Sequence, residues 1–106
     1  MSTKDEEMLR RIVRKAKEVT PADATVILYG SRARGDNRPD SDWDLLIVLN
    51  KDRVSLDDID RVAYPLREEG WDYGADINPI IYSKKAWQAS SFTPFYKNVM
   101  QDGITL

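Results

Sequence analysis

Two aspartates stand two positions apart where a polar loop meets an apolar segment. Asp42 and Asp44 lead into residues 43–49, a run that is otherwise apolar and typical of a buried strand. Side chains alternate between the two faces of a strand, so both carboxylates should point to the same side. Two like charges at this place repel each other unless a cation lies between them, and carboxylate oxygens suit Mg²⁺ or Mn²⁺. The spacing favours a divalent-cation site over the alternative, two ordinary solvated acids.

A third acidic residue, Asp76, lies within the apolar segment of residues 75–82. An acid in such a strand needs a polar or charged partner. If this strand lies beside residues 43–49, the three carboxylates could surround a pair of metal ions. The alternative is an acid at the end of the strand that faces solvent.

A glycine turn and a group of arginines lie between the first apolar strand and the acidic pair. Gly30 and Ser31 directly follow residues 24–29 and precede a predicted helical turn, where backbone N–H groups can bind phosphate. The alternative is a plain turn capped by Ser31. The guanidinium groups that follow suit phosphate oxygens, although surface ion pairs with neighbouring acids are the competing explanation. They belong to Arg32, Arg34 and Arg38.

The composition excludes several kinds of chemistry. The 106 residues include no Cys and no His, which excludes disulfides, zinc fingers, thiol nucleophiles and Ser-His-Asp triads. The 16 basic and 18 acidic residues give a net charge of −2, which disfavours nucleic-acid binding by bulk charge. Residues 30–35 have the glycine spacing of a P-loop but lack the Lys and Ser/Thr that must follow. An EF-hand beginning at Asp40 fails at its glycine and at its closing glutamate.

The elements that must position these residues follow from hydrophobic periodicity. Short apolar, β-branched runs predict strands at residues 24–29, 43–49, 75–82 and 104–106. Helical spacing predicts helices at residues 3–19, 55–69 and, interrupted around Pro94, 84–100. Pro79 indicates that its strand lies at an edge of the sheet or contains a bulge. The alternation predicts an α/β or α+β domain, a small mixed sheet flanked by helices.

Helix ends are indicated by polar residues and by proline and glycine. Two N-terminal caps are predicted, at Thr3 with Glu6 and at Ser55 with Asp58. Gly70 is expected to end the second helix. Pro65 removes a helix hydrogen bond and is expected to kink this helix or end it early.

The segment from Gly30 to Leu49, GSRARGDNRPDSDWDLLIVL, resembles the signature of the minimal nucleotidyltransferases of the DNA polymerase β-type superfamily. The shared pattern is a strand, Gly-Ser, an Ala-Arg-Gly step, a loop, Ser-Asp-x-Asp-Leu and a second strand. The segments INPIIYSKKAW and PFYKNVMQDGITL are similar to the tail of small members. Trp43 departs from the pattern, because a smaller aliphatic residue is common there. Its side chain should face away from the acids.

The resemblance implies a role for each matching residue. Gly30 and Ser31 would bind the triphosphate of a nucleotide. Arg34 is our candidate for an arginine that contacts it, although the sequence does not decide between Arg32, Arg34 and Arg38. Asp42 and Asp44 would hold Mg²⁺ or Mn²⁺. Asp76 would be the third acid, binding a second metal ion and helping to deprotonate the acceptor hydroxyl.

The resemblance also implies an activity and partners. The expected reaction transfers a nucleoside monophosphate, AMP from ATP, to a hydroxyl of a protein or small molecule. Small members often work with a separately encoded helical partner, so the alternative is an antitoxin-like binding subunit with a vestigial site. A third interpretation, nucleic-acid binding by basic residues in 10–17, is disfavoured by the net charge. No segment has the length of a membrane span, so we expect one cytoplasmic domain over residues 1–106.

Overall fold

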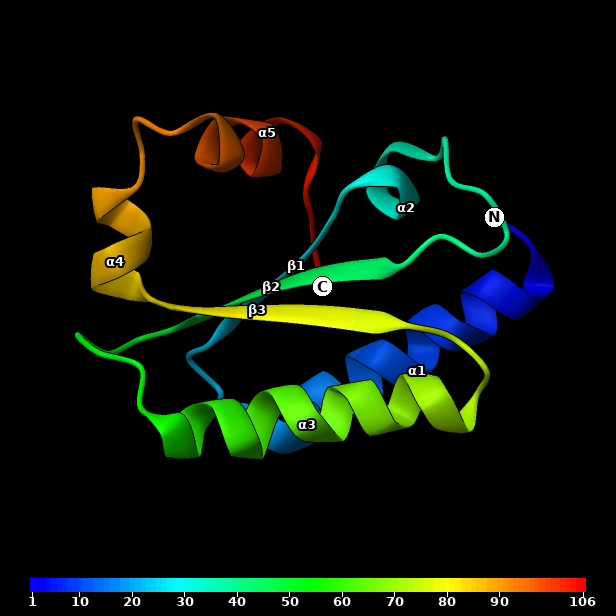
Figure 1. The fold of residues 1–106 in the computed structure, drawn as a ribbon, viewed down its shortest axis with the longest axis horizontal. Coiled ribbons are helices and arrows are strands. Elements are labelled where there is room, and N and C mark those ends of the chain that lie inside the picture. Colours follow the sequence, from blue (N-terminus) through cyan, green and yellow to red (C-terminus); the bar gives the residue numbers. More distant parts are fainter.

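The computed structural model describes residues 1–106, and a four-stranded sheet forms its centre (Figure 1). The strand order is β3-β2-β1-β4, with β1 (Thr25–Tyr29), β2 (Trp43–Leu49), β3 (Ile77–Ser83) and β4 (Ile104–Thr105). Strand β2 pairs in parallel with β3 and antiparallel with β1, and β1 pairs antiparallel with β4. The predicted mixed sheet is confirmed. Pro79 lies on the edge strand β3, where its missing N–H does least harm.

Helices cover both faces of the sheet (Figure 1). The long helices α1 (Thr3–Val19) and α3 (Leu56–Asp72) cover one face and bury the larger hydrophobic core against it. The short helices α4 (Lys84–Ala89) and α5 (Pro94–Asp102) cover the other face around a smaller core. A single turn, α2 (Ser31–Arg34), follows β1 at the end of the sheet. The predicted break around Pro94 is confirmed, because α5 begins at this residue.

The N-terminal cap of α1 differs from the prediction. Ser2, not Thr3, is the cap, and its side chain accepts a hydrogen bond of 3.1 Å from the backbone N–H of Asp5. Thr3 is already the first residue of the helix. The backbone N–H three positions further on is therefore not free to donate a hydrogen bond to its side chain. The capping box of Ser55 and Asp58 at the start of α3 is confirmed.

Helix α3 is longer than predicted. It continues through Pro65 and Gly70 to Asp72, so the predicted end at Gly70 is wrong, and so is the early end that was one of the two alternatives at Pro65. Gly70 is buried, and a Cβ built on it would lie 2.9 Å from the carbonyl oxygen of Ala75 and 2.9 Å from Ile77. The glycine therefore allows the returning chain to pack closely on the helix rather than ending it.

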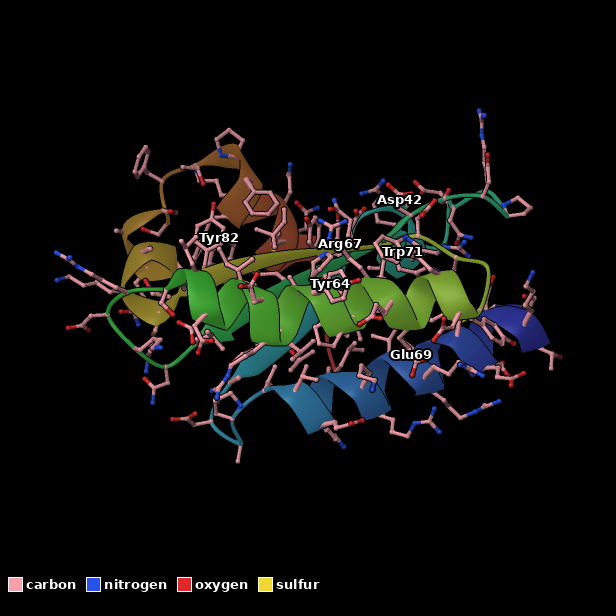
Figure 2. All side chains as sticks on the ribbon, turned by 60° about the horizontal axis from the view of Figure 1, so that its bottom comes forward. Asp42, Tyr64, Arg67, Glu69, Trp71 and Tyr82 are labelled. Carbon is pink, nitrogen blue, oxygen red and sulfur yellow. The ribbon has the colours of Figure 1, made fainter.

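The surface of α3 is divided between partners and solvent (Figure 2). Glu69 faces α1 and pairs with Arg11 at 3.1 Å. Tyr64 and Trp71 lie on the outer side, about half exposed, and their rings meet edge to face. None of the helices combines the length and the apolar character that crossing a membrane requires.

Candidate active site

One end of the sheet gathers the residues that the sequence singled out. Because β1 runs antiparallel to β2 and β3, its C-terminal end lies at the same end of the sheet as the N-terminal ends of β2 and β3. Tyr29 pairs with Asp44, and Asp44 pairs with Asn78 on the other side. The turn at Gly30 therefore lies directly beside the start of β2.

Gly30 and Asp44 are in close contact. Gly30 has a φ of +76°, in the region that favours glycine, and a Cβ built on it would lie 2.5 Å from Oδ2 of Asp44. The carbonyl oxygen of Gly30 accepts hydrogen bonds of 3.1 Å from the N–H groups of Ala33 and Arg34, which closes the α2 turn. Ser31 begins this turn and is half-buried. The turn and the carboxylate thus form one compact unit.

The two aspartates of the pair have different surroundings. Asp42 is exposed in the loop before β2, whereas Asp44 is half-buried. Burial raises the pKa of Asp44, a hydrogen bond from the Asn78 side chain lowers it, the charge of Asp42 raises it and that of Arg34 lowers it. The ionised form of the Asp44 carboxyl group is therefore disfavoured, and a divalent cation bound beside it would stabilise this form.

Asp76 lies one residue before β3 and is exposed. Its carbonyl oxygen accepts a hydrogen bond of 2.8 Å from the N–H of Trp43, so its backbone is tied to the start of β2. No three acidic side chains in the chain lie close enough together to hold one metal ion. Asp42 and Asp44 are two positions apart at the start of β2. Their oxygens are suitable ligands for a single Mg²⁺ or Mn²⁺.

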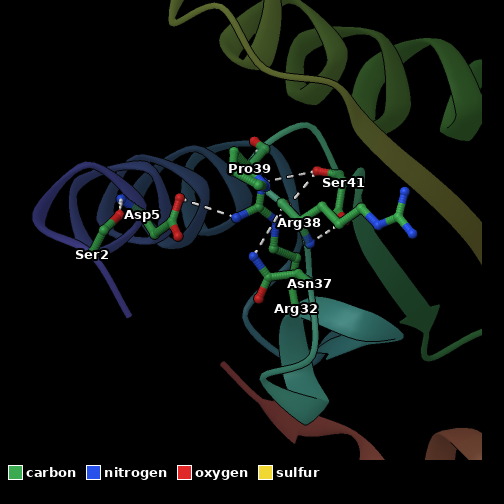
Figure 3. A network of polar contacts seen from close by, with 7 residues as sticks. All are labelled: Ser2, Asp5, Arg32, Asn37, Arg38, Pro39 and Ser41. Atoms are coloured by element: carbon green, nitrogen blue, oxygen red, sulfur yellow. Dashed lines mark hydrogen bonds and ion pairs between the residues drawn. The ribbon is translucent and has the colours of Figure 1, made fainter.

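The three arginines are not equivalent (Figure 3). Arg32 is buried and stacks on Trp43, with its guanidinium carbon 4.4 Å from the ring centroid. It also donates hydrogen bonds to the carbonyl oxygens of Pro39 and Ser41, at 3.1 and 2.9 Å, and pairs with Asp5 at 3.0 Å. Arg32 therefore ties the loop before Asp42 to the rest of the fold, through Nε and Nη2.

Arg34 and Arg38 are exposed and available to a ligand. Arg34 pairs with Asp36 at 3.2 Å and, more loosely, with Asp102 at 3.9 Å, and its charge acts on Asp44. No ion pair of Arg38 is seen within 4.0 Å. Of the three arginines, Arg34 is the one whose charge reaches the acidic pair.

Two residues of the site were missed from the sequence. Asn78 faces Asp44 across the parallel pair, and Tyr29 faces it across the antiparallel pair. Burial, with smaller effects of Asp44 and Tyr82, raises the pKa of Tyr29 to about 12, so its hydroxyl stays protonated. The only sequence signal for Asn78 was a polar residue within an apolar run.

Comparisons with known proteins point to one family. The family described as "Nucleotidyltransferase domain" matches residues 7–99. The chain is 35% identical over 81 residues to the protein named "Putative protein adenylyltransferase MJ0604" of Methanocaldococcus jannaschii, covering 76% of this chain and 75% of that protein. A solved structure described as "Crystal structure of the toxin-antitoxin with AMP-PNP" superposes with a TM-score of 0.63 at 15% identity, over 91% of this chain and 69% of the other. That likeness supports the fold, and the sequence matches show that the chain belongs to the nucleotidyltransferase domain family.

Proposed function

We propose that the protein transfers AMP from ATP to a hydroxyl group in a Mg²⁺-dependent reaction. The observation that carries this proposal is the contact between the Gly30 turn and the Asp44 carboxylate. In the proposed reaction, this contact keeps the turn that would bind the phosphates beside the carboxylate that would bind Mg²⁺.

Each residue of the unit has a part in this reaction. The backbone of Gly30 and Ser31 would bind the phosphates, with Arg34 as the nearby cation. Asp42 and Asp44 would hold Mg²⁺, which neutralises the charge of the triphosphate. The residues thus act by positioning and by electrostatics, as in phosphoryl transfer generally.

The transfer forms one bond to the α-phosphorus and breaks another. The acceptor oxygen bonds to the α-phosphorus, the bond to the bridging oxygen of the β-phosphate breaks, and pyrophosphate leaves. The proton of the acceptor hydroxyl must pass to a base, and Asp76 is the residue predicted for this step from the sequence. Tyr29 is unsuited to it, because its hydroxyl stays protonated at neutral pH.

The proposed acceptor is a protein hydroxyl. The support is that the relative from Methanocaldococcus jannaschii is named "Putative protein adenylyltransferase MJ0604". A separately encoded helical protein, of the kind that the family resemblance implies, is the first acceptor to examine.

The test measures which phosphate of ATP is transferred to the acceptor. The protein is incubated with Mg²⁺ and its candidate acceptor, using ATP labelled on the α-phosphate in one sample and on the γ-phosphate in another. Labelling of the acceptor from the α-phosphate alone supports AMP transfer, whereas labelling from the γ-phosphate indicates a kinase. The double variant Asp42→Asn/Asp44→Asn should lose the label, and Asp40→Asn, an exposed acid of the same loop, should keep it.

A second candidate is a binding subunit that blocks a partner without catalysis. The observation in its favour is that only two carboxylates, not three, are close to one another at the site. Full neutralisation of the partner by the Asp42→Ala/Asp44→Ala variant would support it. Retained binding with lost neutralisation would support the transferase instead.

A further inference from the structure

One flank of α3 carries exposed apolar side chains that no other element of the chain covers. Leu56, Tyr64 and Trp71 are 81%, 55% and 54% exposed. Together with Asp60 and Arg67 they follow each other at intervals of 4, 4, 3 and 4 residues, which places all five on one stripe of the helix. Figure 2 shows Tyr64, Arg67 and Trp71 on the side of α3 that faces away from α1. Exposed apolar groups gathered in this way are typical of a binding surface.

The two charged residues of this stripe have no partner within the chain. Asp60 is exposed and Arg67 is half-buried, and neither makes an ion pair within 4.0 Å. They are seven residues apart, about 10.5 Å along the helix, so they do not meet each other. The neighbouring charges Asp57 and Arg61 pair with each other at 3.3 Å. The stripe therefore offers one free negative and one free positive charge to a partner.

The stripe is complementary to a second copy of itself. Two identical helices related by a twofold axis perpendicular to them run antiparallel, and each contact between them occurs twice. Positions 56 and 71 have the same midpoint as positions 60 and 67, between residues 63 and 64. An axis at this midpoint places Leu56 of one copy against Trp71 of the other, and Asp60 against Arg67. Tyr64 of both copies then lies beside the axis.

The neighbouring edge of the sheet does not offer an equivalent surface. Strand β3 is an edge strand, and an unpaired edge is a template for a further strand. Pro79 within β3 has no backbone N–H, and proline on an edge strand disfavours such addition. Association is therefore expected through the helix rather than through the sheet.

We propose that the protein self-associates as a symmetric dimer through the α3 stripe, which consists of Leu56, Asp60, Tyr64, Arg67 and Trp71. A partner of different sequence would require no match between the two halves of the stripe, so the match favours a second copy. This association is independent of the proposed reaction.

The dimer would keep both candidate active sites open. The chain passes directly from the end of α3 at Asp72 to the start of β3 at Ile77, so the C-terminal end of α3 lies at the end of the sheet that carries Asp44. Because the two α3 helices are antiparallel, the two sites would lie at opposite ends of the dimer.

The experiment measures the molar mass of the full chain by sedimentation equilibrium across a wide range of protein concentrations. We expect a monomer–dimer equilibrium for the wild type. Asp60→Arg and Arg67→Asp each place like charges opposite each other, and each should weaken self-association about tenfold. The double variant Asp60→Arg/Arg67→Asp restores opposite charges and should recover the affinity of the wild type. Trp71→Ala should weaken self-association about thirtyfold, because aromatic residues dominate the binding energy of interfaces.

The matched control is Asp72→Arg, a charge reversal at an exposed residue of the same helix. Its side chain is turned by about 100° from that of Trp71, so the affinity should not change. Circular dichroism should show the same helical content in all variants, because none of the substituted residues belongs to the buried core.

Three other outcomes would each overturn the proposal. A wild type that stays monomeric at every concentration would leave the stripe to a partner of different sequence. A dimer that neither single charge variant weakens would place the interface elsewhere. Weakening by both single variants, without recovery in the double variant, would show that Asp60 and Arg67 do not face each other across a twofold axis.

Discussion

Oδ2 of Asp44 occupies the place where a side chain on Gly30 would stand, since a Cβ built there would lie 2.5 Å from it. Two features therefore require glycine at position 30: the φ of +76° and this contact. The first requirement concerns the backbone and the second concerns the carboxylate. Two other glycines share the backbone requirement without the contact, which allows the two to be separated.

Gly30→Ala should abolish nucleotide binding, whereas Gly35→Ala should retain it. Both glycines have positive φ, but only Gly35, with ψ of 10°, is in the left-handed helical region, where alanine costs about 1–2 kcal/mol. Gly30 has ψ of −158°, in a region that is essentially restricted to glycine, so Gly30→Ala should destabilise the fold more than Gly35→Ala. Nothing lies within 4 Å of a Cβ at Gly35, while at Gly30 the methyl group must displace Asp44. The measurement is the rise in thermal stability with Mg²⁺ and AMP-PNP, about 2.7 kcal/mol at a hundred times the Kd. An equal rise in both variants would contradict the importance of the contact.

Asp44→Asn should stabilise the protein at neutral pH in the absence of metal. Burial raises the pKa of Asp44 above its usual value, so the folded state binds a proton more readily than the unfolded chain. The ionised form therefore weakens the fold once the pH rises through the folded pKa, and the amide removes this penalty. Below the ordinary value of 3.8 the acid is protonated in both states, and the advantage of the variant should vanish.

Urea unfolding of the wild type and Asp44→Asn between pH 3 and pH 7 would measure this difference. The matched control is Asp40→Asn, an exposed residue of the preceding loop. A gain of stability that is independent of pH would mean that packing, rather than ionisation, explains the effect.

The alternation of side chains in a strand predicted more of the site than any other rule. It places Trp43 on the side of β2 opposite Asp44, and Trp43 is 1% exposed within the larger core. Asp42 lies in the loop before this strand. The pattern needed no knowledge of neighbouring strands, because it depends only on the geometry of one strand.

The register between neighbouring strands could not be predicted from the sequence. The run ADINPIIY contains Asp76 and Asn78 at positions of equal parity, so alternation alone cannot tell which of them faces Asp44. The register decides, and it selects Asn78. The arginines show the same limit, because the burial of Arg32 depends on Trp43 and Asp5, which come from separate elements.

Gly70→Ala should destabilise the protein, although alanine is the better helix former. In an open helix the change would gain up to about 1 kcal/mol. Here the new methyl group would lie 2.9 Å from the carbonyl oxygen of Ala75, and overpacking of this kind costs about 1–3 kcal/mol. A midpoint of urea unfolding above that of the wild type would contradict the close packing of α3 on the start of β3.

Arg32→Lys should destabilise the protein by about 3 kcal/mol, despite keeping the charge. Lysine has no planar fork, so it cannot reach the carbonyl oxygens of Pro39 and Ser41 while stacking on Trp43. Nη1 of Arg32 pairs with Asp5 and has no other polar partner. The substitution would therefore also remove the ion pair of Asp5. Arg38→Lys, on the exposed side of the same loop, should change the free energy of unfolding by less than about 0.5 kcal/mol.

A double-mutant cycle separates the ion pair from the rest of this network. Asp5→Asn alone should cost less than Arg32→Lys, because Asp5 is partly exposed and makes only one of the contacts of Arg32. The combined variant should be less destabilised than the sum of the two, since the pair is lost in either. Mn²⁺ binding should weaken in Arg32→Lys but not in Asp5→Asn, because the bonds to Pro39 and Ser41 hold the loop that presents Asp42. Equal Mn²⁺ affinity in wild type and Arg32→Lys would show that Arg32 stabilises the fold without positioning the site.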